Sequence, residues 1–171
     1  MLKLGFDLGK DIRKDNSLLL YALESAGKSN VAFIRNILEV GADINATHSG
    51  YYDRTPIQIF TGNPDFTVVN KKNEILHLLL SQPKINLKYQ DCVGNAFLHL
   101  LTDKNDFFLE NYDTIINTLK EKGDINVLLV KNNKGNTVLD IVKHKLLGLR
   151  NRSPLELYLK LEQEQNALLN Q

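Results

Sequence analysis

The chain has 171 residues, of which 43% are apolar and 24% are charged, and its formal net charge is +1. This balance is ordinary for a globular protein, and it excludes the strongly basic field that draws proteins to nucleic acid or to anionic membranes. No apolar run approaches the roughly 20 residues that span a bilayer, and the single cysteine, Cys92, excludes an internal disulfide and favours a reducing compartment such as the cytoplasm.

The N-terminal segment, residues 1–15, has the pattern of a helix end followed by a turn. The turn is "GKDI" at 9–12, and a related turn, "GADI", begins at Gly41, 32 residues after Gly9. Glycine suits the end of a helix because it tolerates a positive φ angle. We therefore expect the chain to begin inside a structural unit, with residues 1–15 as a partial N-terminal unit.

Similar segments recur along the rest of the chain. Thr55 begins "TPIQ", Ala96 begins "AFLH" and Thr137 begins "TVLD", at intervals of 41 residues, and Ser17 begins a looser, earlier copy. Self-similarity at a fixed period is the signature of a repeat architecture. We expect one domain over residues 1–171, in which repeats at 16–52, 53–93 and 94–134 precede a C-terminal capping repeat at 135–171.

Each repeat has the pattern of a helix, a loop, a second helix and a turn. A small or polar residue opens the first apolar segment, and where it is Thr or Ser its side-chain oxygen can accept a hydrogen bond from a free backbone N–H. A polar loop leads to a longer helical pattern, such as the one that contains Ile75 and Leu79. Gly41 and Gly123 stand where that helix should end. The pattern predicts an all-α fold with almost no strand.

The last helix is expected at residues 153–169. Ser153 can cap it, Pro154 fits its first position, and Glu156 completes a capping box. A terminal repeat needs a polar outer face, and the polar run "EQEQN" near the end suits that role. The alternative is that these Glu and Gln residues serve as an export or docking signal.

The repeated segments resemble the ankyrin repeat. "RTPIQIF" at 54–60 is similar to the family's T-P-L-H-x-A, and "ILEVGADINA" at 37–46 is similar to its apolar helix with a G-A-D-V-N ending. The resemblance implies a solenoid of stacked helix-loop-helix repeats. Because the family period is about 33 residues, the longer period here implies long turns and extended inter-helix loops. The Thr–His hydrogen bond of the family is expected to be missing, because the repeat that keeps a histidine, His99, has Ala96 in place of threonine.

The expected inter-helix loops carry phenylalanines. Asp65-Phe66 recurs as Asp106-Phe107 at the common 41-residue offset, and Phe108 follows. This recurrence makes the phenylalanines part of the repeating unit. We expect them to anchor the loops on the outer helices, with a second binding surface as the alternative.

Motifs for catalysis, metal binding and phosphate binding are missing from the sequence. It contains no G-x-G-x-x-G, no G-x-x-x-x-G-K-S/T, no H-E-x-x-H, no C-x-x-C and no G-x-S-x-G. His99 takes the structural position of the family's histidine, and a nucleophile pair of Cys92 with His99 lacks an orienting third group. We therefore expect no enzyme, no catalytic residue, no cofactor and no metal.

The turns between repeats are the expected binding surface. Solenoids of this kind bind partners with their turn tips and concave face. Tyr and Arg are enriched at binding hot spots because they offer a large rigid area and a polar group. The candidate partner-binding residues are His48, Tyr51, Tyr52, Asp53, Arg54, Lys88, Tyr89, Gln90 and Asp91.

These features predict a monomeric, non-catalytic module that binds another protein, and they predict neither nucleic acid nor membrane as a partner. The Asn-, Lys- and Ile-rich composition and the polar tail admit a bacterial effector that is secreted into the cytosol of a eukaryotic host. The start inside a repeat admits a targeting domain cut from a longer multidomain enzyme or effector. Fold-level analogy carries part of this expectation.

Overall fold

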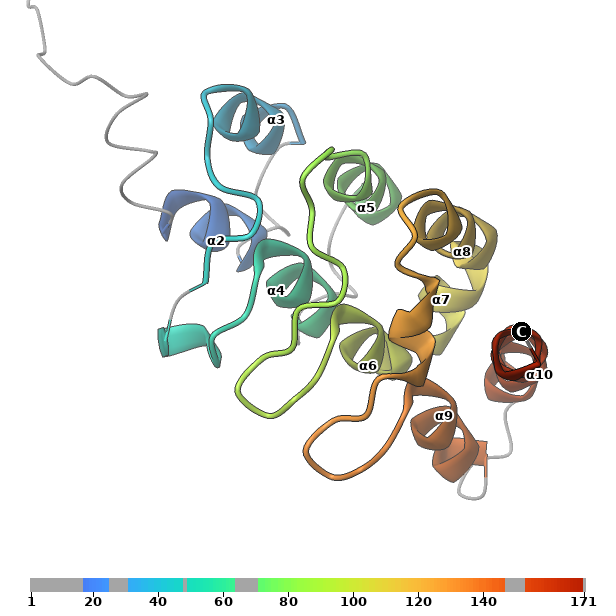
Figure 1. Ribbon diagram of the computed structural model, residues 1–171. Coiled ribbons are helices and arrows are strands. Elements are labelled where there is room, and N and C mark those ends of the chain that lie inside the picture. Colours follow the sequence, from blue (N-terminus) through green and yellow to red (C-terminus); the bar gives the residue numbers. More distant parts are fainter. Residues whose placement is uncertain (1–16, 25–30, 48, 64–70, 147–152, 171) are drawn as a thin grey trace, which may run out of the picture. The chain divides into compact units, whose positions relative to one another are not determined.

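The described part of this computed structural model is helical. It covers residues 17–24, 31–47, 49–63, 71–146 and 153–170 (Figure 1). Within these ranges the chain forms helices and no β-strand, as the all-α expectation requires. The expected partial unit at 1–15, the candidate residue His48 and Phe66 lie outside the described residues.

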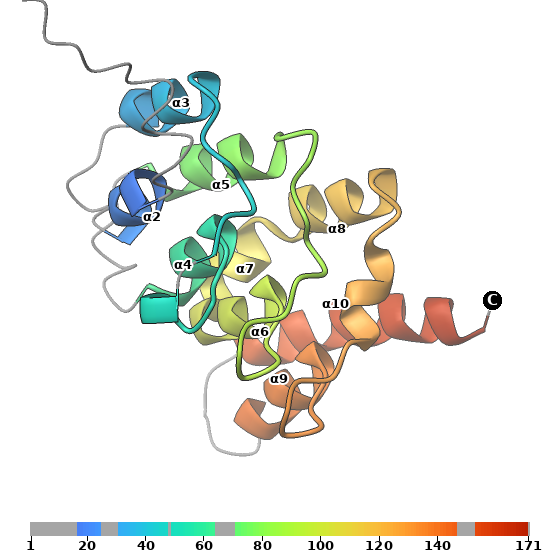
Figure 2. The ribbon, with the colours of Figure 1, turned by 60° about the vertical axis from the view of Figure 1, so that its left-hand side comes forward.

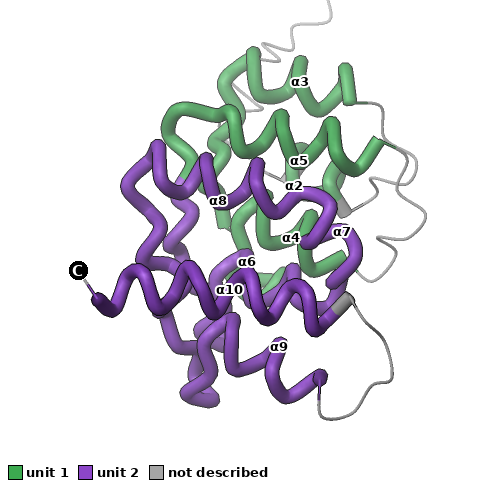
Figure 3. Tube along the Cα trace, turned by 90° about the vertical axis from the view of Figure 1, so that its right-hand side faces the viewer, with its two compact units in different colours: residues 1–85 green, residues 86–171 purple. Residues whose placement is uncertain are grey.

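The chain divides into two compact units, which are described separately below. Unit 1 covers residues 1–85 and unit 2 covers residues 86–171 (Figure 3). The boundary falls inside the repeat expected at 53–93. The single domain over 1–171 and the exact repeat boundaries stay predictions.

Unit 1 contains two helix pairs. The pairs are α2 (Ser17–Glu24) with α3 (Val31–Glu39), and α4 (Pro56–Gly62) with α5 (Lys72–Leu80), and the short helix η1 (Ser49–Tyr51) precedes α4. α2 packs against α3 and α4, and α3 contacts α5 (Figures 1 and 2). First helices of the pairs therefore lie beside each other, as do second helices.

The core of unit 1 is aliphatic with one large ring. Burying an apolar side chain of this size stabilises the fold by roughly 1.5–3 kcal/mol, so this set holds the two helix pairs together. Its largest fully buried side chains are Leu19, Leu20, Leu23, Ile34, Ile57, Phe60, Ile75, Leu76 and Leu79.

Unit 2 begins with the helices of one repeat and ends with a long helix. Its helices are α6 (Phe97–Leu101), η3 (Thr102–Lys104), α7 (Asn105–Glu110), α8 (Tyr112–Glu121), η4 (Ile125–Leu129), α9 (Val138–Leu146) and α10 (Ser153–Leu169). α6 contacts α9, and α10 packs on α9 and α7 (Figure 1). α10 has the bounds that the capping-box signal predicts.

The prediction of an extended loop between the two helices of the repeat at 94–134 is wrong, because this segment is helical. η3 and α7 occupy residues 102–110. Phe107 and Phe108 are both buried, and the ring of Phe108 lies 6.3 Å from that of Tyr112. Both rings are therefore core residues of the helical segment, and Phe108 contacts the outer helix α8 through Tyr112. Their burial supplies the tertiary packing on which most helical stability depends, and this outweighs the weak helix signal of the polar flank.

The hydrogen bond expected to be missing has substitutes. The Oε1 atom of Gln58 accepts from the Thr55 backbone N–H at 2.9 Å and from its hydroxyl at 3.1 Å. Asp140 does the same for Thr137, with distances of 2.9 and 2.8 Å to one carboxylate oxygen. Both acceptors stand where the family has histidine. The bridge that closes the first helical turn is thus kept with different side chains.

Two helices end as their glycines predict. Gly41 and Gly123 have φ angles of 103° and 69°. The Gly41 N–H donates to the Leu38 carbonyl at 3.0 Å, and the Ala42 N–H donates to the Ile37 carbonyl at 3.1 Å. This pair of bonds is the Schellman motif, which satisfies the last carbonyls of a helix. The "GADIN" segment is therefore a helix stop.

α10 buries a face that the sequence did not single out. Leu157 and Leu161 are buried, whereas Leu155 and Leu159 are 50% and 49% exposed. The Tyr112 hydroxyl donates to the Lys160 carbonyl at 2.9 Å, and the Lys160 ammonium lies 4.9 Å from the centre of the Tyr112 ring. These contacts attach α10 to α8. The exposed positions of α10 combine polar residues with Leu155, Leu159 and Leu169.

Candidate functional site

The tyrosine turn, residues 51–54 of unit 1, is a tight turn in a strained conformation. The Arg54 N–H donates to the Tyr51 carbonyl at 3.1 Å. The two central residues, Tyr52 and Asp53, have φ angles of 60° and 55°. Positive φ at both central positions is the type I′ pattern, which normally uses Gly or Asn. Such conformations cost about 1–3 kcal/mol per residue and occur preferentially at functional sites.

The turn displays an aromatic ring and a guanidinium group together. Tyr52 is 59% exposed, and the Arg54 guanidinium carbon lies 5.0 Å from the centre of its ring. A pocket of about 250 Å³ opens beside them, lined also by Tyr51, Ile59 and Asn63. A rigid aromatic face next to a cation and a small cavity can anchor a partner side chain.

The second candidate segment, residues 88–91, lies in unit 2, and most of its side chains bind other parts of that unit. Lys88 forms an ion pair with Asp124 at 2.8 Å. Gln90 donates to the Gly94 carbonyl at 2.6 Å and to the Lys131 carbonyl at 3.0 Å. Asp91 is 4% exposed, and Tyr89 is partly exposed. The two candidate segments thus belong to different units.

Two turns of unit 2, the first at residues 91–95 and the second at residues 132–136, share one hydrogen-bond pattern at the 41-residue offset. The Asp91 carboxylate accepts from the N–H groups of Val93 and Asn95 at 3.1 and 2.9 Å. The Asn132 side-chain oxygen accepts from the N–H groups of Lys134 and Asn136 at 3.0 and 3.1 Å. Asp91 therefore organises its turn as Asn132 organises the next one.

The two turns are also joined to each other. The Asn133 N–H donates to the Val93 carbonyl at 3.1 Å, and its side-chain amide donates to the Cys92 carbonyl at 3.1 Å. The Asn132 amide donates to the Asn95 side-chain oxygen at 3.0 Å. Consecutive turns of unit 2 thus stack through backbone and amide hydrogen bonds, which gives this surface a fixed shape.

The side chain of His99 connects the start of its own helix with the second turn. Its Nδ1 accepts from the Ala96 N–H at 3.1 Å, and its Nε2 lies 3.2 Å from the Asn136 carbonyl, to which it donates. Only the neutral ring with its proton on Nε2 makes both bonds. Burial lowers the pKa of His99 below its ordinary value of 6.5, because desolvation disfavours the charged ring. The residue is structural, as the sequence predicts.

Acidification should therefore destabilise the protein through His99. In the unfolded chain the His99 ring is protonated near pH 6.5, whereas in the folded chain it is protonated only at a lower pH. The free energy of unfolding should thus fall as the pH drops from about 6.5 toward the lower pKa of the folded state. Urea unfolding at pH 7.5 and pH 5.0 measures the change.

The His99→Gln variant should lose this part of the pH dependence, because glutamine does not titrate and serves at the equivalent position, Gln58. His77→Gln, at an exposed position of α5, is the control and should keep the wild-type slope. An unchanged slope in His99→Gln would assign the effect to other groups. Asp140 acts at a lower pH, since its hydrogen bonds from Thr137 lower its pKa below 3.8.

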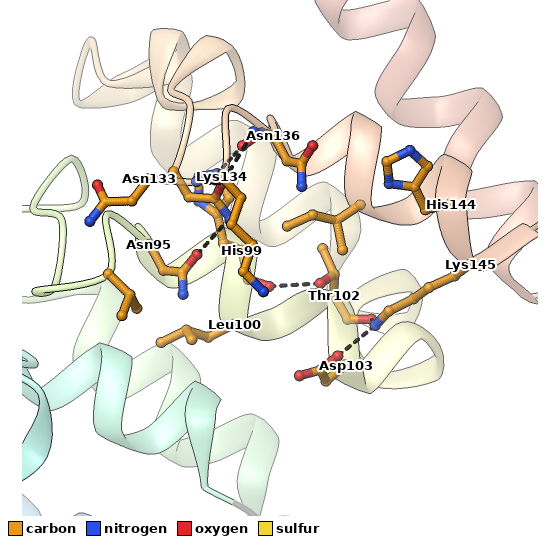
Figure 4. A pocket seen from close by; sticks show the side chains of 13 residues that line it. Asn95, His99, Leu100, Thr102, Asp103, Asn133, Lys134, Asn136, His144 and Lys145 are labelled. Atoms are coloured by element: carbon orange, nitrogen blue, oxygen red, sulfur yellow. Dashed lines mark hydrogen bonds and ion pairs between the residues drawn. The ribbon is translucent and has the colours of Figure 1, made fainter.

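A larger pocket, of about 630 Å³, lies in unit 2 below these turns (Figure 4). Its walls combine the second turn with the side chains of α6, η3 and α9, among them Asn136, His144 and Lys145. The sequence interpretation missed this site. Two signals were available: the recurrence of an asparagine at 95 and 136, and the basic end of α9.

In the described ranges, no three or more His, Cys, Asp and Glu side chains come together in a way that could hold a metal ion. No helix in those ranges has both the length and the apolar character needed to cross a bilayer.

Comparison with known proteins connects the chain to ankyrin repeats. No family model matches it. Over 61 residues it is 38% identical to a protein of Acanthamoeba polyphaga mimivirus that is named as an ankyrin repeat protein. The match covers 36% of this chain, which spans only 7% of the relative's length. The match supports ankyrin-like repeats here, in agreement with the motifs at 37–46 and 54–60.

Proposed function

We propose that this chain is a non-catalytic, ankyrin-like solenoid that binds another protein through its turns and the helices beneath them. The tyrosine turn carries the proposal. It holds Tyr52 exposed in a left-handed conformation beside Arg54, and this conformation costs stability. An exposed, preorganised aromatic ring loses little conformational freedom when a partner covers it.

The packing of both units supports the same proposal. In unit 1 the helix pairs place α2 beside α4 and α3 beside α5, and in unit 2 consecutive turns are joined by Asn132 and Asn133. Repeats that pack in this way present a continuous, rigid set of turns. The 61-residue similarity to an ankyrin repeat protein is a second, independent support.

The double variant Tyr51→Ala with Tyr52→Ala tests this function. Because Tyr52 is exposed, we expect the free energy of unfolding to change by no more than about 1 kcal/mol and partner capture to fall strongly. Immobilised wild-type and variant chains are incubated with lysate from the native source, and the bound proteins are quantified by mass spectrometry. Urea unfolding of both chains measures the stability.

The matched control is Tyr21→Ala, which removes a tyrosine that is 62% exposed on α2, away from the turn. It should keep every partner that the wild type binds. Equal capture by the wild type and the double variant would remove the turn from the binding surface. A large loss of stability in the double variant would show that the rings are structural.

A further inference from the structure

The pocket of unit 2 has an excess of positive charge. Lys145 is neutralised within it, because its ammonium donates to the Asp103 carboxylate at 2.6 Å and to the Thr102 carbonyl at 2.7 Å. Lys134 is exposed and has no ion pair among the described residues. His144 is also exposed in the lining, and its ring nitrogens can form hydrogen bonds with an oxygen of a bound group. The pocket therefore favours an anionic group.

The pocket is also lined by the side-chain amide of Asn136. The Asn132 and Asn133 side chains are engaged with the neighbouring turn. Asn136 lines the same wall, and its side chain makes no hydrogen bond to another described residue (Figure 4). Its carbonyl and NH₂ groups can pair with the backbone of an extended peptide.

Apolar side chains complete the lining. Leu100 of α6 and Ile141 of α9 lie in the wall together with Val93 of the first turn. An aliphatic side chain of a bound molecule would fit against these apolar residues. The lining contains no Phe, Tyr or Trp ring, whereas single-stranded nucleic acid needs such rings for base stacking. The combination favours a peptide over a nucleotide.

We propose that this pocket binds an acidic segment of the partner protein, one that places a glutamate or aspartate carboxylate beside an aliphatic side chain. Lys134 attracts the carboxylate, and His144 can form a hydrogen bond with it. Asn136 pairs with the peptide backbone, and Leu100 and Ile141 receive the aliphatic group. This inference rests on the proposed protein-binding function and names the chemistry of the segment that is bound.

A peptide titration tests the inference directly. The probe is a fluorescein-labelled hexapeptide of alternating glutamate and leucine, and its counterpart has glutamine in place of glutamate. Binding is followed by fluorescence anisotropy at pH 6.5 and, with ¹⁵N-labelled full-length chain, by backbone amide shifts. We expect the acidic peptide to bind more tightly than the glutamine peptide, with shifts in residues 132–136 and α9, and to weaken as salt is added.

Variants of Lys134 and His144 locate the site. Each exposed polar contact of this kind is worth a factor of roughly 1.4 to 5 in affinity, so Lys134→Gln with His144→Gln should weaken binding of the acidic peptide by roughly twofold to thirtyfold. Asn136→Asp keeps the shape of the side chain and adds a negative charge, so it should weaken binding as well. Lys143→Gln, exposed on α9 outside the pocket lining, should have little effect.

Three results would overturn the inference: equal binding of the two peptides, an equal loss in Lys143→Gln, or tighter binding of a single-stranded oligonucleotide at the same residues. A protein captured from lysate separates this inference from the proposed function. If the Lys134→Gln, His144→Gln chain still captures it while the tyrosine variant does not, the pocket assignment is wrong and the function stands. If neither variant changes capture, both the pocket assignment and binding through the tyrosine turn are wrong.

Discussion

Replacing Gly94 by alanine should destabilise the protein by about 2–5 kcal/mol, whereas the same change at Gly135 should cost only about 1–2 kcal/mol. The two glycines are equivalent in consecutive turns, with φ angles of 78° and 79°. Alanine is strained at both, because a left-handed backbone places its Cβ against the following carbonyl. The shared part of the cost is therefore the same.

The difference arises from the stacked turn. A Cβ atom at Gly94 would lie 2.6 Å from the Asn133 backbone nitrogen and closer still to its side-chain oxygen, whereas nothing lies within 4 Å of one at Gly135. The added methyl group would therefore push the second turn away and weaken its bond to the Val93 carbonyl. Thermal unfolding measures the effect, since 1 kcal/mol shifts the melting temperature by about 2–4 °C in a chain of this size.

Gly135→Ala serves as the internal control for backbone strain. Equal losses in the two variants would show that the turns of unit 2 do not stack as described. A larger loss at Gly135 would contradict the geometry outright.

Leu79→Ala should cost about 2–5 kcal/mol, the range for a leucine removed from a well-packed core. Leu79 is fully buried in α5 of unit 1. Its loss leaves a cavity that the surrounding helices can fill only partly. Leu159→Ala, which removes the same atoms from a half-exposed position of α10, should cost about 1 kcal/mol or less. Urea unfolding of both variants compares the two losses.

Hydrogen exchange shows how far the damage of Leu79→Ala extends. If the repeats form one stacked array, as proposed, amide protection should fall in α5 and also in the helices of unit 2. Ile116→Ala, at a buried position of α8, is the reciprocal test. Loss confined to the unit that carries the substitution would contradict a single array, and a loss below about 1 kcal/mol would contradict the burial of Leu79.

Local signals in the sequence predicted where several of the described helices begin or end. Thr55, Ala96 and Thr137 each precede a helix, and the capping box predicted the bounds of α10. Gly41 and Gly123 adopt the positive φ angles that their positions predicted. These signals succeed because a cap or a helix stop depends on residues within one helical turn of each other.

Only the tertiary structure showed which of the polar turn residues form hydrogen bonds within the fold and which line a pocket. The sequence offered Gln90 and Asp91 as binding residues, but their partners are Lys131, Gly94 and the turn backbone. The sequence repeats an asparagine at 95 and 136, but it did not show that the Asn136 side chain lines a pocket. It also could not show that α7 replaces a loop.

The physical reason is the distance along the chain between the interacting groups. The amides that stack the turns of unit 2 join residues about 40 positions apart, and the rings that stabilise α7 depend on packing against other helices. A repeat period places such residues in equivalent positions, but it does not say which side chain contacts a neighbour. The sequence alone therefore predicted an all-α chain with repeats that resemble the ankyrin repeat, and contacts between segments far apart in the chain determined the shape of the candidate surface in unit 2.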